Sequence, residues 1–289
     1  MAAAVLIAPT IHTILKKERL IPGQTSKLVI HAPAIAAAAR PGNFVILRVR
    51  DKSERIPLTI ADVDATAGSV TIVYLVLGKT TALLEELDEG DVILDLCGPL
   101  GKPTHIEKVG TVVCVGGGTG IAAMHHIAKG HHLAGNHVVS IIGARSHSLL
   151  LFHAEFSAFC SEVLVSTDDG SFGRKGFVTE LLKEYLEEDK TVAEVVGVGP
   201  VSMMEAVART TKPFNIKTTV SLNSIMIDGV GMCGACRVTV NGQTKFTCVD
   251  GPEFDGQLVD FVEMRQRLAA FKSQEAISYE EYKRRHGRL

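Results

Sequence analysis

The chain has 289 residues, of which 46% are hydrophobic and 21% are charged, as in globular proteins built from two or three compact units. Its formal net charge of −2 argues against nucleic acid or an anionic membrane surface as the main partner. No apolar run approaches the roughly 20 residues that cross a bilayer. The apolar start from Met1 to Leu15 lacks the basic leader and the cleavage site of a secretory signal. We therefore expect a cytoplasmic chain with no nucleic-acid or membrane partner.

Short segments rich in β-branched residues follow one another over the first hundred positions. Strands are expected at 27–31, 44–49, 69–76 and 91–94, and turn pairs such as Pro22-Gly23 and Pro41-Gly42 separate them. A single helix is expected near 81–87. Strands at this spacing predict a small antiparallel β-barrel over residues 1–103.

Two segments of this expected barrel carry candidate ligand-binding residues. The segment Arg55-Ile-Pro-Leu-Thr59 is expected at the end of a strand, and Gly78, Thr80 and Thr81 stand where the helix starts. A helix start with a glycine and capping threonines offers N–H groups and the positive end of the helix dipole to a pyrophosphate. The segment is not a P-loop, because Val73 stands where the first glycine should be. An ordinary capped helix explains it equally well.

From Gly110 onward, apolar strands alternate with helices. Strands are expected at 111–115, 138–142, 163–166, 195–198 and 217–220, and helices at 119–129, 149–160, 178–188 and 202–210. This alternation predicts a doubly wound parallel sheet, with helices on both faces, over residues 104–222.

A glycine-rich loop joins the first of these strands to a helix, which is the setting of a dinucleotide phosphate loop. It consists of Gly116, Gly117, Gly118, Thr119 and Gly120. Ile121 replaces the third glycine of the usual fingerprint, and close packing alone also explains glycines at a strand end. Arg145 follows the second strand where an acidic residue is usual, so NAD and NADP both stay open. Gly199 and Pro200, after the fourth strand, are expected at the same crevice, while the polar loop 168–173 either contacts the nucleotide or is a solvated turn.

Three cysteines and an aspartate form the strongest motif of the chain. Cys233 and Cys236 make a C-x2-C pair, Cys248 follows after eleven residues, and Asp228 stands five positions before the pair. With a cysteine in place of the aspartate, this would be the plant-type 2Fe–2S spacing. Neighbouring glycines permit the close approach and unusual φ values of a cluster loop. The motif predicts a 2Fe–2S cluster in residues 223–257, followed by a charged tail at 258–289.

Other interpretations of this motif are a zinc site or three unrelated buried cysteines. Zinc sites of this type use two separated ligand pairs, and only one C-x2-C pair is present. For Asp228 the alternative is a turn-forming role before Gly229. As a ligand, its carboxylate would be harder than a thiolate and would donate less charge to iron.

In this order, the motifs resemble those of the ferredoxin–NADP reductase superfamily. Within this superfamily, the chain resembles the branch of the dihydroorotate dehydrogenase electron-transfer subunits. The relatives in this branch include the small subunit of NADH-dependent reduced ferredoxin:NADP oxidoreductase, which is also described as sulfide dehydrogenase. The resemblance runs from 41–45 through 55–59, 98–101 and 116–120 to 199–200 and Cys248. The dihydroorotate branch carries a cysteine at the position of Asp228. An aspartate at this position resembles the small subunit of the bifurcating oxidoreductase instead.

The resemblance implies three cofactor sites. FAD would be held by Arg55, Pro57, Leu58 and Thr59, with Gly78, Thr80 and Thr81 near its pyrophosphate; the cluster ligands would be Asp228, Cys233, Cys236 and Cys248. NAD(H) would bind at the glycine loop, with NADP(H) not excluded. Many members of the superfamily carry an aromatic residue where this chain has Pro57.

The resemblance also implies a heterodimer with a larger subunit that carries flavin and iron–sulfur centres, and ferredoxin reached through that complex. The resulting hypothesis is a relay in which NADH gives hydride to FAD and single electrons pass on to the cluster. No catalytic acid or base is expected, because positioning is the main contribution of the protein. The alternatives are an electron-transfer subunit of dihydroorotate dehydrogenase and a non-catalytic redox-sensing module.

Overall fold

The computed structural model describes residues 9–188 and 191–287, so part of the apolar start at 1–15 lies outside the described residues. The first part of the chain is a six-stranded antiparallel sheet in the order β1-β2-β5-β4-β3-β6. Its strands are β1 (Ile14–Ile21), β2 (Thr25–His31), β3 (Phe44–Arg48), β4 (Arg55–Asp64), β5 (Ser69–Leu75) and β6 (Asp95–Leu100). A bridge between Thr13 and Val92 brings the two edges of the sheet together. The predicted antiparallel barrel is confirmed.

Two strand predictions within the barrel are wrong. Residues 91–94 contribute only the bridge at Val92, and the strand begins at Asp95, where pairing with β3 starts. The segment from Arg55 begins β4 instead of ending a strand. Pro57 is tolerated there because β4 pairs with β5 only from Ile60 onward, which leaves one edge of this stretch without a ladder partner.

Two helices, rather than the single one expected, belong to the barrel. They are α1 (Pro33–Ala38) and α2 (Lys79–Glu85). Pro33 has no backbone N–H, but the first residue of a helix has no intrahelical acceptor for one, so proline fits at the start of α1. Ile35 and Ala36 of this helix are buried.

The second part of the chain is a seven-stranded sheet in the order β10-β9-β8-β7-β11-β12-β15. Its strands are β7 (Thr111–Gly117), β8 (His137–Ala144), β9 (Glu162–Thr167), β10 (Arg174–Lys175), β11 (Val192–Val198), β12 (Lys217–Ser221) and β15 (Glu253–Asp255). All neighbouring strands are parallel except β15, which runs antiparallel to β12. The predicted parallel sheet is therefore confirmed, with an added antiparallel edge.

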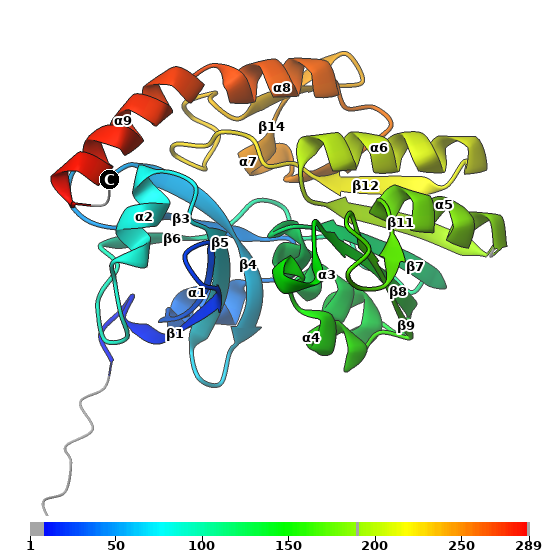
Figure 1. Cartoon of the computed structure of the whole chain (residues 1–289), viewed down its shortest axis with the longest axis horizontal. Helices are drawn as coiled ribbons and strands as arrows, with labels where there is room; N and C mark the ends of the chain where they lie inside the picture. The colour runs from blue at the N-terminus through cyan, green and yellow to red at the C-terminus, as the bar shows by residue number, and fades with distance from the viewer. Residues whose placement is uncertain (1–8, 189–190, 288–289) are drawn as a thin grey trace, which may run out of the picture.

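Helices cover both faces of this sheet, as Figure 1 shows. On one face lie α3 (Gly120–Leu133) and α4 (His153–Ser157), and on the other α5 (Val178–Glu188) and α6 (Val201–Thr211). The helix expected at 149–160 is shorter than predicted. The left-handed backbone of Phe152, with φ of 60°, separates α4 from the short 3-10 turn η1 (His147–Leu149), and a second such turn, η2 (Lys212–Phe214), follows α6.

The last part of the chain folds back over both sheets. It contains the hairpin β13 (Arg237–Val240) and β14 (Gln243–Phe246), then α7 (Thr247–Asp250), α8 (Phe261–Ala269) and α9 (Lys272–Arg285). The charged tail is helical, and α8 and α9 arch from α6 to α2 (Figure 1). The boundaries at 103, 222 and 257 stay predictions. Among the described residues, no helix has the length and apolar character of a membrane span.

Candidate functional site

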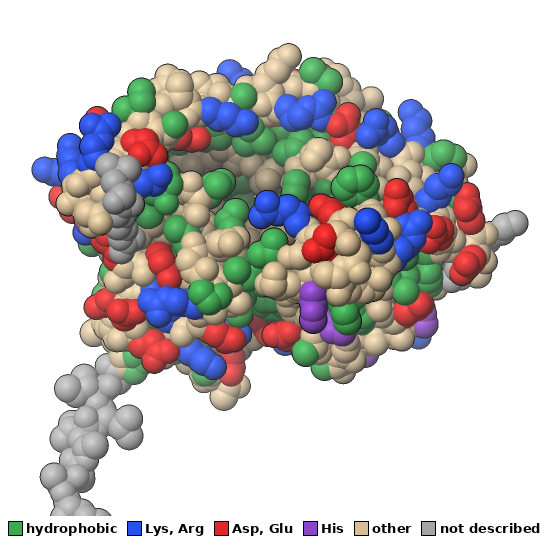
Figure 2. All heavy atoms as spheres, in the orientation of Figure 1, with side chains coloured by type: hydrophobic (Ala, Val, Ile, Leu, Met, Phe, Trp, Pro, Cys, Tyr) green, Lys and Arg blue, Asp and Glu red, His purple; other side chains and the backbone are tan. Residues whose placement is uncertain are grey.

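A cavity of about 650 Å³ lies between the barrel and the parallel sheet. Its walls come from all three parts of the chain. They include Phe44, Pro57, Leu58, Thr59 and Thr81 from the barrel, Gly117 to Gly120, Gly199 and Pro200 from the parallel sheet, and Ser224, Met226 and Pro252 from the last part. Figure 2 shows a hollow lined mainly by hydrophobic and uncharged groups beneath α8 and α9. We refer to the 650 Å³ space as the barrel cavity.

The barrel cavity has features that suit an aromatic ligand with polar edges. Most of its walls are apolar, but the hydroxyl of Ser224 is buried there without a hydrogen-bond partner among the described residues. A buried polar atom without a partner costs stability, so a ligand that supplies one would bind favourably. The isoalloxazine ring of a flavin combines apolar faces with such polar edges, and the residues present therefore fit it.

The start of helix α2 differs from its prediction. The Thr81 hydroxyl accepts hydrogen bonds from the backbone N–H groups of Leu77 at 3.0 Å and Gly78 at 3.1 Å. The Thr80 hydroxyl donates to the Glu54 carboxylate at 2.8 Å. The two backbone N–H groups of Leu77 and Gly78 are thus already bonded within the chain. The contact of a flavin pyrophosphate with this turn stays a prediction. Arg55 is exposed at the start of β4 and does not line the barrel cavity.

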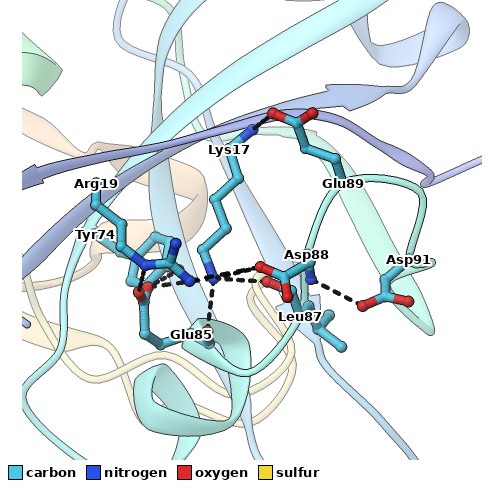
Figure 3. A network of polar contacts seen from close by, with 8 residues as sticks. All are labelled: Lys17, Arg19, Tyr74, Glu85, Leu87, Asp88, Glu89 and Asp91. Atoms are coloured by element: carbon cyan, nitrogen blue, oxygen red, sulfur yellow. Dashed lines mark hydrogen bonds and ion pairs between the residues drawn. The ribbon is translucent and has the colours of Figure 1, made fainter.

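A polar network at the other end of α2 fixes the position of this helix (Figure 3). The Lys17 ammonium donates to the backbone carbonyls of Glu85 and Leu87, each at 2.6 Å, where the helix dipole is negative. Burial opposes ionisation of Glu85, but hydrogen bonds from Tyr74 and Ser26 and the charge of Lys17 lower the pKa of its carboxyl. The ionised carboxylate ties α2, the helix that carries Thr81, to the barrel wall through Tyr74.

A second cavity of about 640 Å³ adjoins the first at the carboxyl ends of the parallel strands. The two share Leu75, Gly117, Gly118, Thr119 and Pro200 as lining residues. Arg145 after β8, Asp168 after β9 and Phe177 before α5 line its far part. This is the crevice that the glycine loop predicts, and we refer to it as the nucleotide cavity.

The glycines of the loop serve different purposes. A Cβ atom on Gly120 would lie 2.5 Å from the Val198 carbonyl oxygen and 2.6 Å from the Gly199 Cα, so this glycine allows α3 to approach β11. Gly116 is buried and faces Met124. Gly118 has φ of +55° and open space around it, which leaves room for a phosphate beside the loop.

Three of the predicted cluster ligands, Asp228, Cys233 and Cys236, lie in the loop before β13, and Cys248 lies in α7. The Asp228 carboxylate accepts hydrogen bonds from the backbone N–H groups of Val230 at 2.9 Å and Cys233 at 2.6 Å. These bonds lower the pKa of the Asp228 carboxyl. The Sγ atoms of Cys236 and Cys248 are 3.1 Å apart and buried, and burial together with Cys236 raises the pKa of the Cys248 thiol.

These side chains do not form a single-ion site. Among the described residues, no three His, Cys, Asp or Glu side chains converge as the ligands of one metal ion would. A 2Fe–2S cluster instead takes its four ligands in two pairs, one pair on each iron. The observed grouping, Asp228 beside Cys233 and Cys236 beside Cys248, fits such a donor set.

Only a thin apolar layer separates the thiols from the barrel cavity. Phe44 and Met226 pack with Cys236 and Cys248 in one buried group, and the same two side chains line the cavity. A group in the barrel cavity and a cluster on the loop would therefore be near neighbours.

Comparisons with known proteins agree with this geometry. The profile described as the iron–sulfur cluster binding domain of dihydroorotate dehydrogenase B matches residues 223–260. A Thermotoga maritima protein named as a homologue of the dihydroorotate dehydrogenase B (NAD(+)) electron-transfer subunit is 49% identical over 88% of this chain and 89% of its own. The named subunit of Fusobacterium nucleatum is 32% identical, with 80% and 90% covered. The chain belongs to the family of dihydroorotate dehydrogenase B electron-transfer subunits and their homologues.

Solved structures place this family member within a wider fold. One structure, from work on flavin-based electron bifurcation by an NADH-dependent reduced ferredoxin–NADP oxidoreductase, is 45% identical with a TM-score of 0.90, covering 95% of this chain and 99% of that one. The ferredoxin NADP+ reductase of Neisseria gonorrhoeae, with bound FAD and NADP, is 16% identical with a TM-score of 0.58. The family member thus has the ferredoxin reductase-like fold with an added C-terminal iron–sulfur segment, and FAD, NAD(H) and a 2Fe–2S cluster are consistent with it.

Sequence reasoning missed several residues that line the cavities of this electron-transfer subunit homologue. Phe44, Ser224, Met226 and Pro252 line the barrel cavity, and Phe177 lines the nucleotide cavity. Most of them come from the last part of the chain, which pattern analysis treated only as a cluster loop. The cis bond before Pro252 gives no signal in the sequence beyond a Gly-Pro pair.

Proposed function

We propose that this chain is the NAD(H)-side electron-transfer subunit of an electron-bifurcating, NADH-dependent ferredoxin:NADP oxidoreductase complex. Its partner would be a larger subunit that carries flavin and iron–sulfur centres. The observation that carries the proposal is the order of the three sites. The nucleotide cavity shares a wall with the barrel cavity, and Phe44 and Met226 both line the barrel cavity and pack with Cys236 and Cys248 in one buried group.

The residues of the chain would act by positioning. The glycine loop and Pro200 lie between the two cavities, so a nicotinamide ring entering from the nucleotide cavity would meet the ring of a flavin there. Pro57, Leu58 and Thr59 would hold the flavin on the barrel side, and Ser224 would supply a polar contact. When bound, FAD supplies the conversion of a two-electron hydride into single electrons that the cluster takes up. Asp228 and the three cysteines would hold that cluster.

The test is spectroscopic. Protein prepared without oxygen should contain FAD, iron and sulfide, and NADH should bleach its flavin absorbance and generate the EPR signal of a reduced 2Fe–2S cluster. Zinc in place of iron, or a flavin band that NADH never changes, would contradict the proposal. Bound nucleotide without FAD would point to a redox sensor.

A second function, electron transfer to a dihydroorotate dehydrogenase, is favoured by the names of the relatives at 49% and 32% identity. The aspartate at position 228 favours the bifurcating complex through the resemblance described above. The two are separated by the partner that co-purifies with the chain. A dihydroorotate-oxidising partner would support the second function, and a larger subunit that reduces NADP+ and ferredoxin would support the first.

A further inference from the structure

A row of polar side chains extends along one face of strand β12, from the protein surface to the barrel cavity. Side chains at alternate positions of a strand share a face, and Lys217, Thr219 and Ser221 form this row. Lys217 at one end is exposed, whereas Ser221 at the other end lines the barrel cavity. The row therefore joins the solvent to the cavity.

Each strand next to β12 adds a glutamate to this face. On β11, the Glu194 carboxylate accepts a hydrogen bond from the Thr219 hydroxyl at 2.8 Å and pairs with the Lys217 ammonium at 3.0 Å. On β15, Glu253 lies directly opposite Ser221 in the antiparallel register, so these two side chains share a face. One glutamate thus lies at the outer end of the row and the other at its inner end.

The barrel cavity itself offers no proton acceptor. Within the described part of the chain, no residue that lines it carries an ionisable side chain. Glu253 adjoins two of the lining residues, Pro252 in the sequence and Ser221 in the sheet. Its carboxyl is therefore placed to take up a proton that leaves the cavity through this wall.

The surroundings of Glu253 suit it to gain and lose a proton near neutral pH. Burial raises the pKa of its carboxyl to about 7, and the charge of Glu194 adds to the rise while Lys217 opposes it. Cys114 on β7 interacts with both glutamates, and burial holds the pKa of its thiol well above the usual value. His131 on α3 interacts with Glu194 and Lys217, and burial lowers the pKa of its imidazole. Near pH 7 the thiol and the imidazole therefore stay neutral, while the Glu253 carboxyl changes state.

The electron relay of the proposed function requires a proton to leave the barrel cavity. When both electrons of a hydride are passed on singly, NADH yields NAD+, one proton and two electrons. A cluster takes up the electrons but not the hydrogen that the hydride carried into the cavity. One proton per NADH must therefore reach the solvent.

We propose that Glu253 accepts this proton from the barrel cavity and that the polar row of β12, with Glu194, conducts it to the solvent. The inference rests on the proposed function and deepens it, because it assigns the exit of the proton. The Ser221 hydroxyl at the cavity wall and the Thr219 hydroxyl further along the row can each accept one proton while donating another. Glu253 acts here as a proton acceptor beside the cavity and not as a group that contacts the nucleotide.

The experiment separates arrival of the hydride from release of the proton. The full chain, loaded with FAD and its cluster, is reduced with one equivalent of NADH without oxygen and then mixed with ferricyanide. Overall, NADH and two ferricyanide ions give NAD+, one proton and two ferrocyanide ions. The rate at which the flavin band recovers, divided by the rate at which NADH bleaches it, should fall at least about tenfold in Glu253→Gln. Glutamine keeps the shape of the side chain but cannot take up the proton.

The pH profile distinguishes a proton acceptor from a structural residue. In the wild type the recovery rate should rise with pH around a midpoint near 7, because only the ionised carboxyl accepts a proton. The profile of Glu253→Gln should be flat. Glu194→Gln should move the midpoint to lower pH, since it removes a negative charge that raises the pKa of Glu253.

Asp62→Asn is the matched control. Asp62 follows Ala61, another lining residue of the barrel cavity, but its carboxylate is bonded to the Lys129 ammonium at 3.0 and 3.1 Å. The ratio of recovery to bleaching in this variant should equal that of the wild type. An independent measurement is infrared spectroscopy of the oxidised chain without nucleotide. The carboxyl band that is missing from Glu253→Gln should titrate with a midpoint near 7.

Four results would overturn the inference: an unchanged ratio in Glu253→Gln, an equal fall in Asp62→Asn, a midpoint that does not move in Glu194→Gln, or an infrared band of Glu253 that titrates near 4.5. Failure of the proposed function looks different. If NADH does not bleach the flavin of the wild type, the relay is wrong and the inference falls with it. If NADH bleaches the flavin and the recovery is independent of Glu253, only the inference is wrong.

Discussion

The Thr104 hydroxyl donates a hydrogen bond of 2.6 Å to the carboxyl of Glu253, which joins the segment after the barrel to the edge strand β15. Burial raises the pKa of Glu253 to about 7, the nearby Glu194 adds to the rise, and Thr104 and Lys217 oppose it. The next residue toward the N-terminus, Pro252, lines the barrel cavity. Protonation of the Glu253 carboxyl therefore takes place where all three parts of the chain meet.

This relationship predicts a pH dependence of stability. The folded pKa of Glu253, about 7, exceeds the ordinary value of 4.5, so the folded state holds the proton more tightly than the unfolded state. The stabilisation is complete below about pH 4.5 and is lost as the pH rises through 7. Glu253→Gln should remove this dependence and gain on the order of 3 kcal/mol relative to wild type between pH 4.5 and 8, measured by urea unfolding. An exposed control, Glu162→Gln, should show the wild-type dependence of unfolding free energy on pH. If the pH dependence of Glu253→Gln ran parallel to that of the wild type, the pKa of Glu253 would be ordinary.

The cluster loop should not tolerate a side chain at Gly229. Its φ is +75°, and a Cβ atom would lie 2.7 Å from both Ile46 Cδ1 and Leu100 Cδ1 of the barrel. Gly229→Ala should lift the loop from the barrel and lower the iron content per chain by more than half. Gly242→Ala is the matched control, because Gly242 has φ of +70° in the adjoining hairpin but open space around it. Equal iron content in the two variants would mean that the contact with the barrel is unimportant.

The Asp228 carboxylate is predicted to be a cluster ligand. Asp228→Cys should keep the iron content and change the EPR spectrum, since a thiolate donates more charge to iron than a carboxylate does. Asp228→Ala should lose most of the iron. Asp255→Cys, in β15 and away from the loop, controls for an added thiol. An EPR spectrum identical to wild type in Asp228→Cys would remove Asp228 from the ligand set and leave it as a turn-forming residue.

Local patterns were sufficient for the parallel sheet and the glycine loop. Strand β7 is buried along its whole length and carries no polar side chain after Thr111, which only a sheet covered on both faces explains, and the glycine loop begins at its end. The barrel was harder to predict, because Pro57 within β4 is compatible with a strand only where one edge lacks a partner, and that depends on distant pairing. For the same reason Phe44 and Met226, which separate the barrel cavity from two cysteines, have no signal in the sequence.

The C-terminal helix α9 should stabilise the barrel chiefly through Tyr282, its buried aromatic side chain. Tyr282 is 4% exposed and packs into the barrel core, and its hydroxyl donates to the Glu86 carboxylate beside α2. Tyr282→Ala should lower the free energy of unfolding by about 3 kcal/mol, because a large buried ring is lost. Ile277→Ala on the same helix should change it by less than about 0.5 kcal/mol, since Ile277 is 62% exposed. Denaturant unfolding of both variants measures the difference. Similar, small losses in the two would mean that α9 detaches from the barrel in solution, because a helix that is not docked loses nothing when its inward-facing ring is removed.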